Sequence, residues 1–74
     1  MHYKLTKADK EIDNRKVTVY GVALTDKHGK TAVSDVSADK NFVKGVVRKL
    51  KKGRVQRDFL LEIVEDLVTE HYSL

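Results

Sequence analysis

Residues 15–36 have the sequence RKVTVYGVALTDKHGKTAVSDV, and the pattern of this stretch decides the fold class. Apolar and β-branched residues alternate along both halves, and residues 26–29 between them form a turn-favouring cluster, a pattern typical of two strands joined by a hairpin. A similar alternation precedes the stretch and ends at Asp13 and Asn14, which tolerate the left-handed backbone of a two-residue loop. The sequence therefore predicts a three-stranded antiparallel meander.

Counting outward from the two turns predicts the register of the sheet, because antiparallel partners lie equally far from a hairpin loop. The predicted partners are Tyr3 with Leu24, Leu5 with Val22, Lys7 with Tyr20, Thr25 with Lys30, and Val22 with Val33. Both hairpins place Val22 on the same face, so the two counts agree. We expect the other face to be partly solvated or to form an interface. It carries Lys4, Thr6, Ala8, Lys10, Ile12, Val17, Val19, Gly21, Ala23 and Val36.

Beyond Ser37 the apolar residues take on helical spacing, which predicts two helices joined by a short loop. Ser37 is a suitable N-cap, so the first helix is expected to begin at Ala38 and to stop at Gly53. The second helix is expected to run from about residue 55 or 56 to about residue 70. Their apolar stripes, which we assign to the core, are Phe42, Val43, Val46, Val47 and Leu50, and Val55, Phe59, Leu60, Ile63, Val64, Leu67 and Val68.

Two consecutive helices that follow a meander must lay both apolar stripes on one face of the sheet. We therefore expect a single α+β domain over residues 1–74, with two layers and the element order β-β-β-α-α. A chain of 74 residues has a small core, and without cysteine it has no disulfide to compensate. The small size therefore favours self-association or docking onto a partner.

The cellular location is predicted from two absences in the sequence. No stretch approaches the roughly 18 consecutive apolar residues of a membrane span, and the first residues lack the apolar segment of a signal peptide. The absence of cysteine suits a reducing compartment. We therefore expect a cytoplasmic protein that does not bind membranes.

Residues that usually carry catalysis or bind metals are scattered. His2, His28 and His71 have no local partner of the kind that a metal site or a general base requires. The isolated glycines form no phosphate-binding loop. Carboxylates lie between the apolar positions of the second helix, which indicates a solvated face; they are Glu62, Glu65, Asp66 and Glu70. The prediction is a protein that is not an enzyme and has no metal site and no cofactor.

Charge is segregated in the helical half of the chain. Residues 40–57 contain eight basic residues and no acidic one, whereas residues 58–74 contain five acidic residues and no basic one, within a formal net charge of +4. Cations clustered on the exposed side of the first helix and on the following loop form a candidate binding surface. The residues that we assign to it are Lys44, Arg48, Lys49, Lys51, Lys52 and Arg54.

Two classes of partner fit this charge pattern. A partner protein, or a second copy in a homodimer, would match the basic and acidic segments by electrostatic complementarity, which predicts a protein-interaction or regulatory module. The alternative is sequence-independent nucleic-acid binding through phosphate contacts of the same cations. A helix-turn-helix would place the second helix in the major groove, where its acidic face would be repelled. Few aromatic residues remain for base stacking, so the protein partner is the preferred prediction.

Three further features carry a resemblance to a known family. They are Tyr20 followed by Gly21 in a strand, a helix start at Ser37, and a terminal helix that contains Val64, Glu65, Asp66 and Leu67. In these features the chain resembles, over nearly its whole length, a small uncharacterised family of unknown function from clostridial bacteria. The resemblance implies a short stand-alone bacterial protein without assigned activity, and it transfers no active site. The basic loop at residues 51–54 departs from the family pattern.

Overall fold

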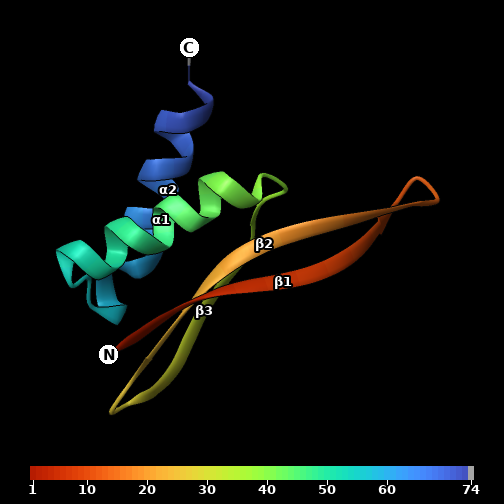
Figure 1. The fold of residues 1–74 in the computed structure, drawn as a ribbon. Coiled ribbons are helices and arrows are strands. Elements are labelled where there is room, and N and C mark those ends of the chain that lie inside the picture. Colours follow the sequence, from red (N-terminus) through yellow and green to blue (C-terminus); the bar gives the residue numbers. More distant parts are fainter. Residues whose placement is uncertain (74) are drawn as a thin grey trace.

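The computed structural model describes residues 1–73, and it has one antiparallel sheet with two helices on one face (Figure 1). The strands follow one another in the order β1-β2-β3, as in a meander. The elements are β1 (His2–Ile12), β2 (Arg15–Asp26), β3 (Gly29–Ser37), α1 (Lys40–Gly53) and α2 (Arg57–Tyr72). The predicted α+β architecture with the order β-β-β-α-α is therefore confirmed.

The two hairpins have the predicted turns and register. Asp13 and Asn14 have φ values of 50° and 65°, as a tight two-residue loop requires, and Gly29 in the second turn has a φ of 119°. All five predicted pairs of strand partners are present. Local turn chemistry thus sets which side chains of the meander face the helices.

The register shifts at one place, beside Gly21. Tyr20 pairs with Ser37 and Val22 pairs with Val33, so three residues of β3 lie opposite a single residue of β2. Asp35, within this bulge, has a φ of 58°. The prediction for Val36 is therefore wrong: the extra residues turn its side chain back to the helix-covered face, where it packs against the core.

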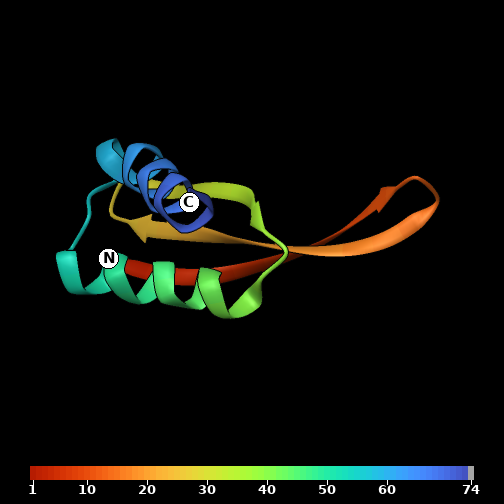
Figure 2. The same cartoon turned by 90° about the horizontal axis from the view of Figure 1, so that it is seen from above.

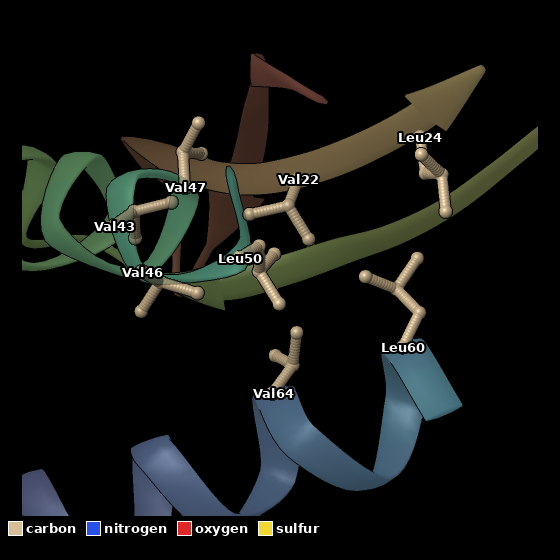
Figure 3. Close-up of a cluster of buried hydrophobic side chains, with 8 residues drawn as sticks. All are labelled: Val22, Leu24, Val43, Val46, Val47, Leu50, Leu60 and Val64. Carbon is tan, nitrogen blue, oxygen red and sulfur yellow. The ribbon is translucent and has the colours of Figure 1, made fainter. Parts of the chain in front are cut away.

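The core lies between the sheet and the two helices. α1 contacts mainly β1 and β2 and lies along that margin of the sheet, whereas α2 contacts β3 and rises from the opposite margin (Figures 1 and 2). Figure 3 shows how the buried side chains of β2, α1 and α2 meet. The buried cluster consists of Val22, Leu24, Val43, Val46, Val47, Leu50, Leu60 and Val64.

Phe59 was predicted to be a core residue, and this prediction is wrong. Its side chain is 55% exposed, whereas Leu60 beside it is 1% exposed. The apolar positions of α2 cover more of the helix circumference than a three-stranded sheet can bury, and Leu60 and Val64 are the positions that face the sheet directly.

The start of α1 differs by two residues from the prediction, because the helix begins at Lys40 and not at Ala38, and its end at Gly53 is as predicted. Asp39 is the N-cap, because its carboxylate accepts a hydrogen bond from the backbone N–H of Phe42 at 3.1 Å. The bulge extends β3 through Ser37, whose buried hydroxyl accepts from Asp39 N–H and bonds to the Tyr72 hydroxyl. At the other end the helix includes Gly53, and Arg54 takes the left-handed conformation with a φ of 50°.

The sheet face opposite the helices is partly protected by charged side chains. Lys10 on β1 forms an ion pair with Asp35 on β3, and β2 lies between these two strands. The pair therefore crosses β2, and Val19 on that face is only 6% exposed. Beyond the Lys10–Asp35 ion pair, the part of the β1–β2 hairpin that includes its turn projects past both helices (Figure 2).

Tyr3 links β1 to the loop between the helices and makes stability depend on pH. Its hydroxyl donates a 2.6 Å hydrogen bond to the backbone oxygen of Val55. Burial raises the pKa of Tyr3, since the phenolate would lose solvation. As the pH rises, the Tyr3 hydroxyl therefore loses its proton in the unfolded chain before it does so in the folded chain. The contribution of the protonated Tyr3 to the free energy of unfolding is complete below about pH 10 and is lost as the pH rises further.

Replacement of this hydroxyl gives a direct test. We expect Tyr3→Phe to lower the free energy of unfolding by about 1 kcal/mol at neutral pH, through loss of the hydrogen bond. Above about pH 10 the difference from the unmodified chain should shrink, because the variant has no phenol at this position to ionise. Urea unfolding followed by circular dichroism at several pH values measures this difference in the free energy of unfolding, with Tyr20→Phe as the control. A constant difference across the pH series would contradict the assignment.

Candidate interaction surface

The six predicted basic residues lie together on α1 and on the residue that follows it. All six side chains are exposed. Lys44, Arg48 and Lys51 follow one another at intervals of four and three residues, so they form a row along one side of the helix, and Lys52 extends it one turn beyond Arg48. We call Lys44, Arg48, Lys49, Lys51, Lys52 and Arg54 the basic surface.

The cations of the basic surface form no ion pair with any acid among residues 1–73. Within residues 1–73, the ion pairs at 4.0 Å or less join Lys10 to Asp35, Arg57 to Asp26, and His71 to Asp39. None of these pairs includes a residue of the basic surface. The positive potential over α1 is therefore available to a partner in solution.

The basic surface begins beside the N-terminal part of β1 and reaches the side of α1 that faces α2. Lys51 and Arg54 line an open hollow together with residues of the β1 N-terminus. Lys49 follows Phe42 by seven residues, so it lies on the same side of α1, and Phe42 stacks on His71 of α2 with ring centroids 3.9 Å apart.

The outer side of α2 carries the opposite charge. Its acidic residues are all exposed, and in the described chain none of them takes part in the three ion pairs. We call this set the acidic face; it consists of Asp58, Glu62, Glu65, Asp66 and Glu70. Both helices cover the same face of the sheet (Figure 2), so this layer of the molecule carries the basic surface on α1 and the acidic face on α2.

The three tyrosines all make contacts within the fold. Tyr3 and Tyr20 pack against the core, and the Tyr72 hydroxyl bonds to Ser37 while its ring meets Phe42 edge-on at 6.0 Å. Tyr3 lies beside the basic surface, because it lines the open hollow together with Lys51 and Arg54, and its hydroxyl is already bonded to the backbone oxygen of Val55.

The histidines have structural surroundings. An open hollow brings His28 near Asp26 and Asp58, but the Asp26 carboxylate accepts a 2.8 Å hydrogen bond from the His28 backbone N–H and lies 3.7 Å from Arg57 Nε. Asp26 thus holds the turn and the start of α2 in place. Across residues 1–73, no group of three or more histidine, aspartate and glutamate side chains could hold a metal ion.

A second surface feature was not predicted from the sequence. A groove opens between α2 and the outer edge of β3, and Asp35, Glu65 and Thr69 are its polar members. We call it the β3 groove; its apolar wall is formed by Val33, Val36, Leu61, Val64 and Val68. The Leu60–Leu61 doublet, with one leucine outside the core stripe, was the available signal in the sequence.

Comparison with known proteins assigns the family. A family model described as a family of unknown function, DUF6514, matches residues 1–70. The chain belongs to this family. The predicted membership in a family of unknown function is thereby confirmed. No curated protein and no solved structure matches the chain. In the described residues, no helix combines the length and the apolar character that a membrane crossing demands.

Proposed function

We propose that the protein is a non-enzymatic interaction module whose basic surface and acidic face dock together onto a protein of complementary charge. The observation that carries this proposal is the presence of opposite charges on two neighbouring helices of one layer, none of them in an ion pair within the part of the chain that the structure describes. Charges arranged in this way accelerate association and fix the orientation of a partner, because each half attracts one sign and repels the other.

The same arrangement favours a protein over a nucleic acid. Electrostatic forces act over about 10 Å at 0.1 M salt, and one helix is about that wide. A polyanion bound along α1 would therefore also meet the repulsion of the acidic face, whereas a protein with both signs of charge would gain from both helices. Nucleic-acid binding through the basic surface stays the alternative that the experiment must separate from this proposal.

The test compares two variants with the same change of net charge. In the first, Lys44→Gln, Arg48→Gln and Lys52→Gln remove charge from the basic surface; in the second, Lys16→Gln, Lys27→Gln and Lys30→Gln remove it elsewhere. The immobilised proteins are exposed to nuclease-treated lysate at about 50 mM salt, where surface electrostatics are strong. We expect the unmodified chain and the second variant to retain the same protein, and the first variant to retain at least about fivefold less, which is a loss of about 1 kcal/mol.

Two further measurements decide between the partner classes. Sedimentation of the purified chain at low and high salt shows whether the partner is a second copy. Titration with labelled RNA and duplex DNA tests the alternative, for which affinity must fall steeply with salt. Retention that occurs only in lysate without nuclease treatment, or that both variants share equally, would contradict the proposal.

A further inference from the structure

The helical layer is wider than the sheet that supports it. Two helices side by side, each about 10 Å across, span about 20 Å. Three strands at a spacing of about 4.8 Å span only about 14 Å. Since α2 lies over β3, the outermost strand on that side (Figure 2), its outer flank extends beyond the sheet. This overhang explains why Leu61 is 56% exposed although it adjoins the fully buried Leu60.

Two binding features coincide beneath the overhang. β3 has a single neighbour, β2, so about half of its backbone N–H and C=O groups point away from the sheet. Directly above this free edge lies the apolar wall of the β3 groove, with Leu61 and Val68 from α2 and Val33 from β3. Recognition by strand addition uses this combination, in which main-chain hydrogen bonds give affinity and side-chain pockets give specificity.

We propose that the β3 groove binds an extended segment of a partner protein, which adds to the free edge of β3 as a fourth strand. Side chains of a strand alternate between the two faces of the sheet, so every second residue of the segment would point toward α2 and cover Leu61 and Val68. The residues of the partner segment that point toward α2 are apolar. Glu65 lines the groove and Glu62 precedes it by three residues on the same acidic face, so the flanking residues of the segment are lysine or arginine.

A second copy of this chain fits the groove less well than a lone segment. Symmetric pairing of two β3 edges would bring two acidic faces together, and such like-charge contact is unfavourable. Pairing of β3 with the β1 edge of another copy would bring the second copy's α1 into the space that α2 already overhangs. An extended segment carries no helix and meets neither obstacle.

The experiment uses the full chain and a defined probe. The probe is a short synthetic peptide of alternating valine and threonine with arginines at both ends; the control peptide has glutamates in place of the arginines. Binding is measured by fluorescence anisotropy, and the site is mapped by amide shifts in the nitrogen-15 spectrum of the protein. We expect shifts along residues 30–33 of β3 and around Leu61 and Val68, and at least about tenfold weaker binding of the glutamate peptide.

Two variants of α2 separate the groove from general electrostatics. Leu61→Asp and Phe59→Asp add the same charge to the same helix at side chains that are 56% and 55% exposed. They lie on opposite sides of α2, because two positions correspond to about 200° of rotation. Leu61→Asp should weaken binding of the arginine peptide at least about tenfold, while Phe59→Asp should change it less than about twofold. Circular dichroism confirms that both variants are folded.

Several outcomes would overturn the proposal. The first three are equal effects of the two variants, equal binding of the two peptides, and peptide-induced shifts confined to α1. The fourth is a doubling of the protein's mass in solution that Leu61→Asp abolishes, because a second copy would then be the occupant of the groove. Glu65 belongs to both the acidic face and the β3 groove, but the lysine and arginine variants change only the basic surface and Leu61→Asp changes only the groove. Each interaction can therefore be lost while the other is still measured.

Discussion

Gly21→Ala should remove most of the stability of the protein at room temperature. A Cβ at this position would lie 2.4 Å from the backbone oxygen of Val33 and 3.0 Å from the Cα of Ser34. Both atoms belong to the backbone of β3, so a rotamer change cannot relieve the contact. The β2–β3 pairing would have to separate, at a cost of about 3 kcal/mol or more. A chain of this size has only about 3 to 5 kcal/mol of stability to lose.

Gly45→Ala is the matched control for this prediction. Gly45 lies inside α1, and a Cβ there would meet no atom within 4 Å. Alanine reduces the backbone freedom of the unfolded chain and favours the helix, so we expect a gain of about 0.5 to 1 kcal/mol. Thermal unfolding followed by circular dichroism should show the Gly45→Ala midpoint about 4 °C above that of the unmodified chain.

Comparable stabilities of Gly21→Ala and the unmodified chain would show that β3 does not cross Gly21 as closely as described. The bulge would then be in error, together with the position of Val36 in the core and the start of the β3 groove. The measurement therefore tests the one part of the sheet that local sequence rules did not predict.

Turn chemistry predicted the meander well because it is local. Asp13, Asn14 and Gly29 each set a backbone conformation within a few residues, and the side-chain alternation then fixes every partner up to the bulge. The bulge depends instead on Asp35 and Gly21, which are far apart in the sequence and meet only in the folded sheet. Counting residues could not place Val36 or Ser37 correctly for this reason.

The two candidate surfaces also differ in whether local sequence rules can predict them. The basic surface follows from the helical spacing of its cations, which a sequence displays directly. The β3 groove follows from the number of strands beneath α2, because a fourth strand would have buried Leu61 and closed the edge. An apolar stripe shows which residues seek burial, but it does not show how much of the stripe the sheet can cover. Phe59 was assigned to the core for this reason, because the stripe alone did not show that the sheet is too narrow to cover it.

Leu60→Ala should remove about 3 kcal/mol of stability, the second largest effect that we predict. Leu60 is 1% exposed and lies in the buried cluster between α2 and the sheet (Figure 3). Truncation leaves a cavity that rigid neighbours from β2 and α1 cannot fill. In urea unfolding, with a slope of about 1 kcal/mol per molar for a chain of this size, the midpoint should fall by about 3 M.

Leu61→Ala is the control, because it removes the same atoms from the next residue of the same helix. Because the Leu61 side chain is 56% exposed, Leu61→Ala should lower the free energy of unfolding by less than about 0.5 kcal/mol. Consecutive residues differ by about 100° around a helix, so the pair of variants reports how α2 is rotated on the sheet. A larger loss for Leu61→Ala than for Leu60→Ala would mean a different rotation. The acidic face would then point elsewhere and Leu61 would leave the β3 groove, so neither proposed interaction could stand in its present form.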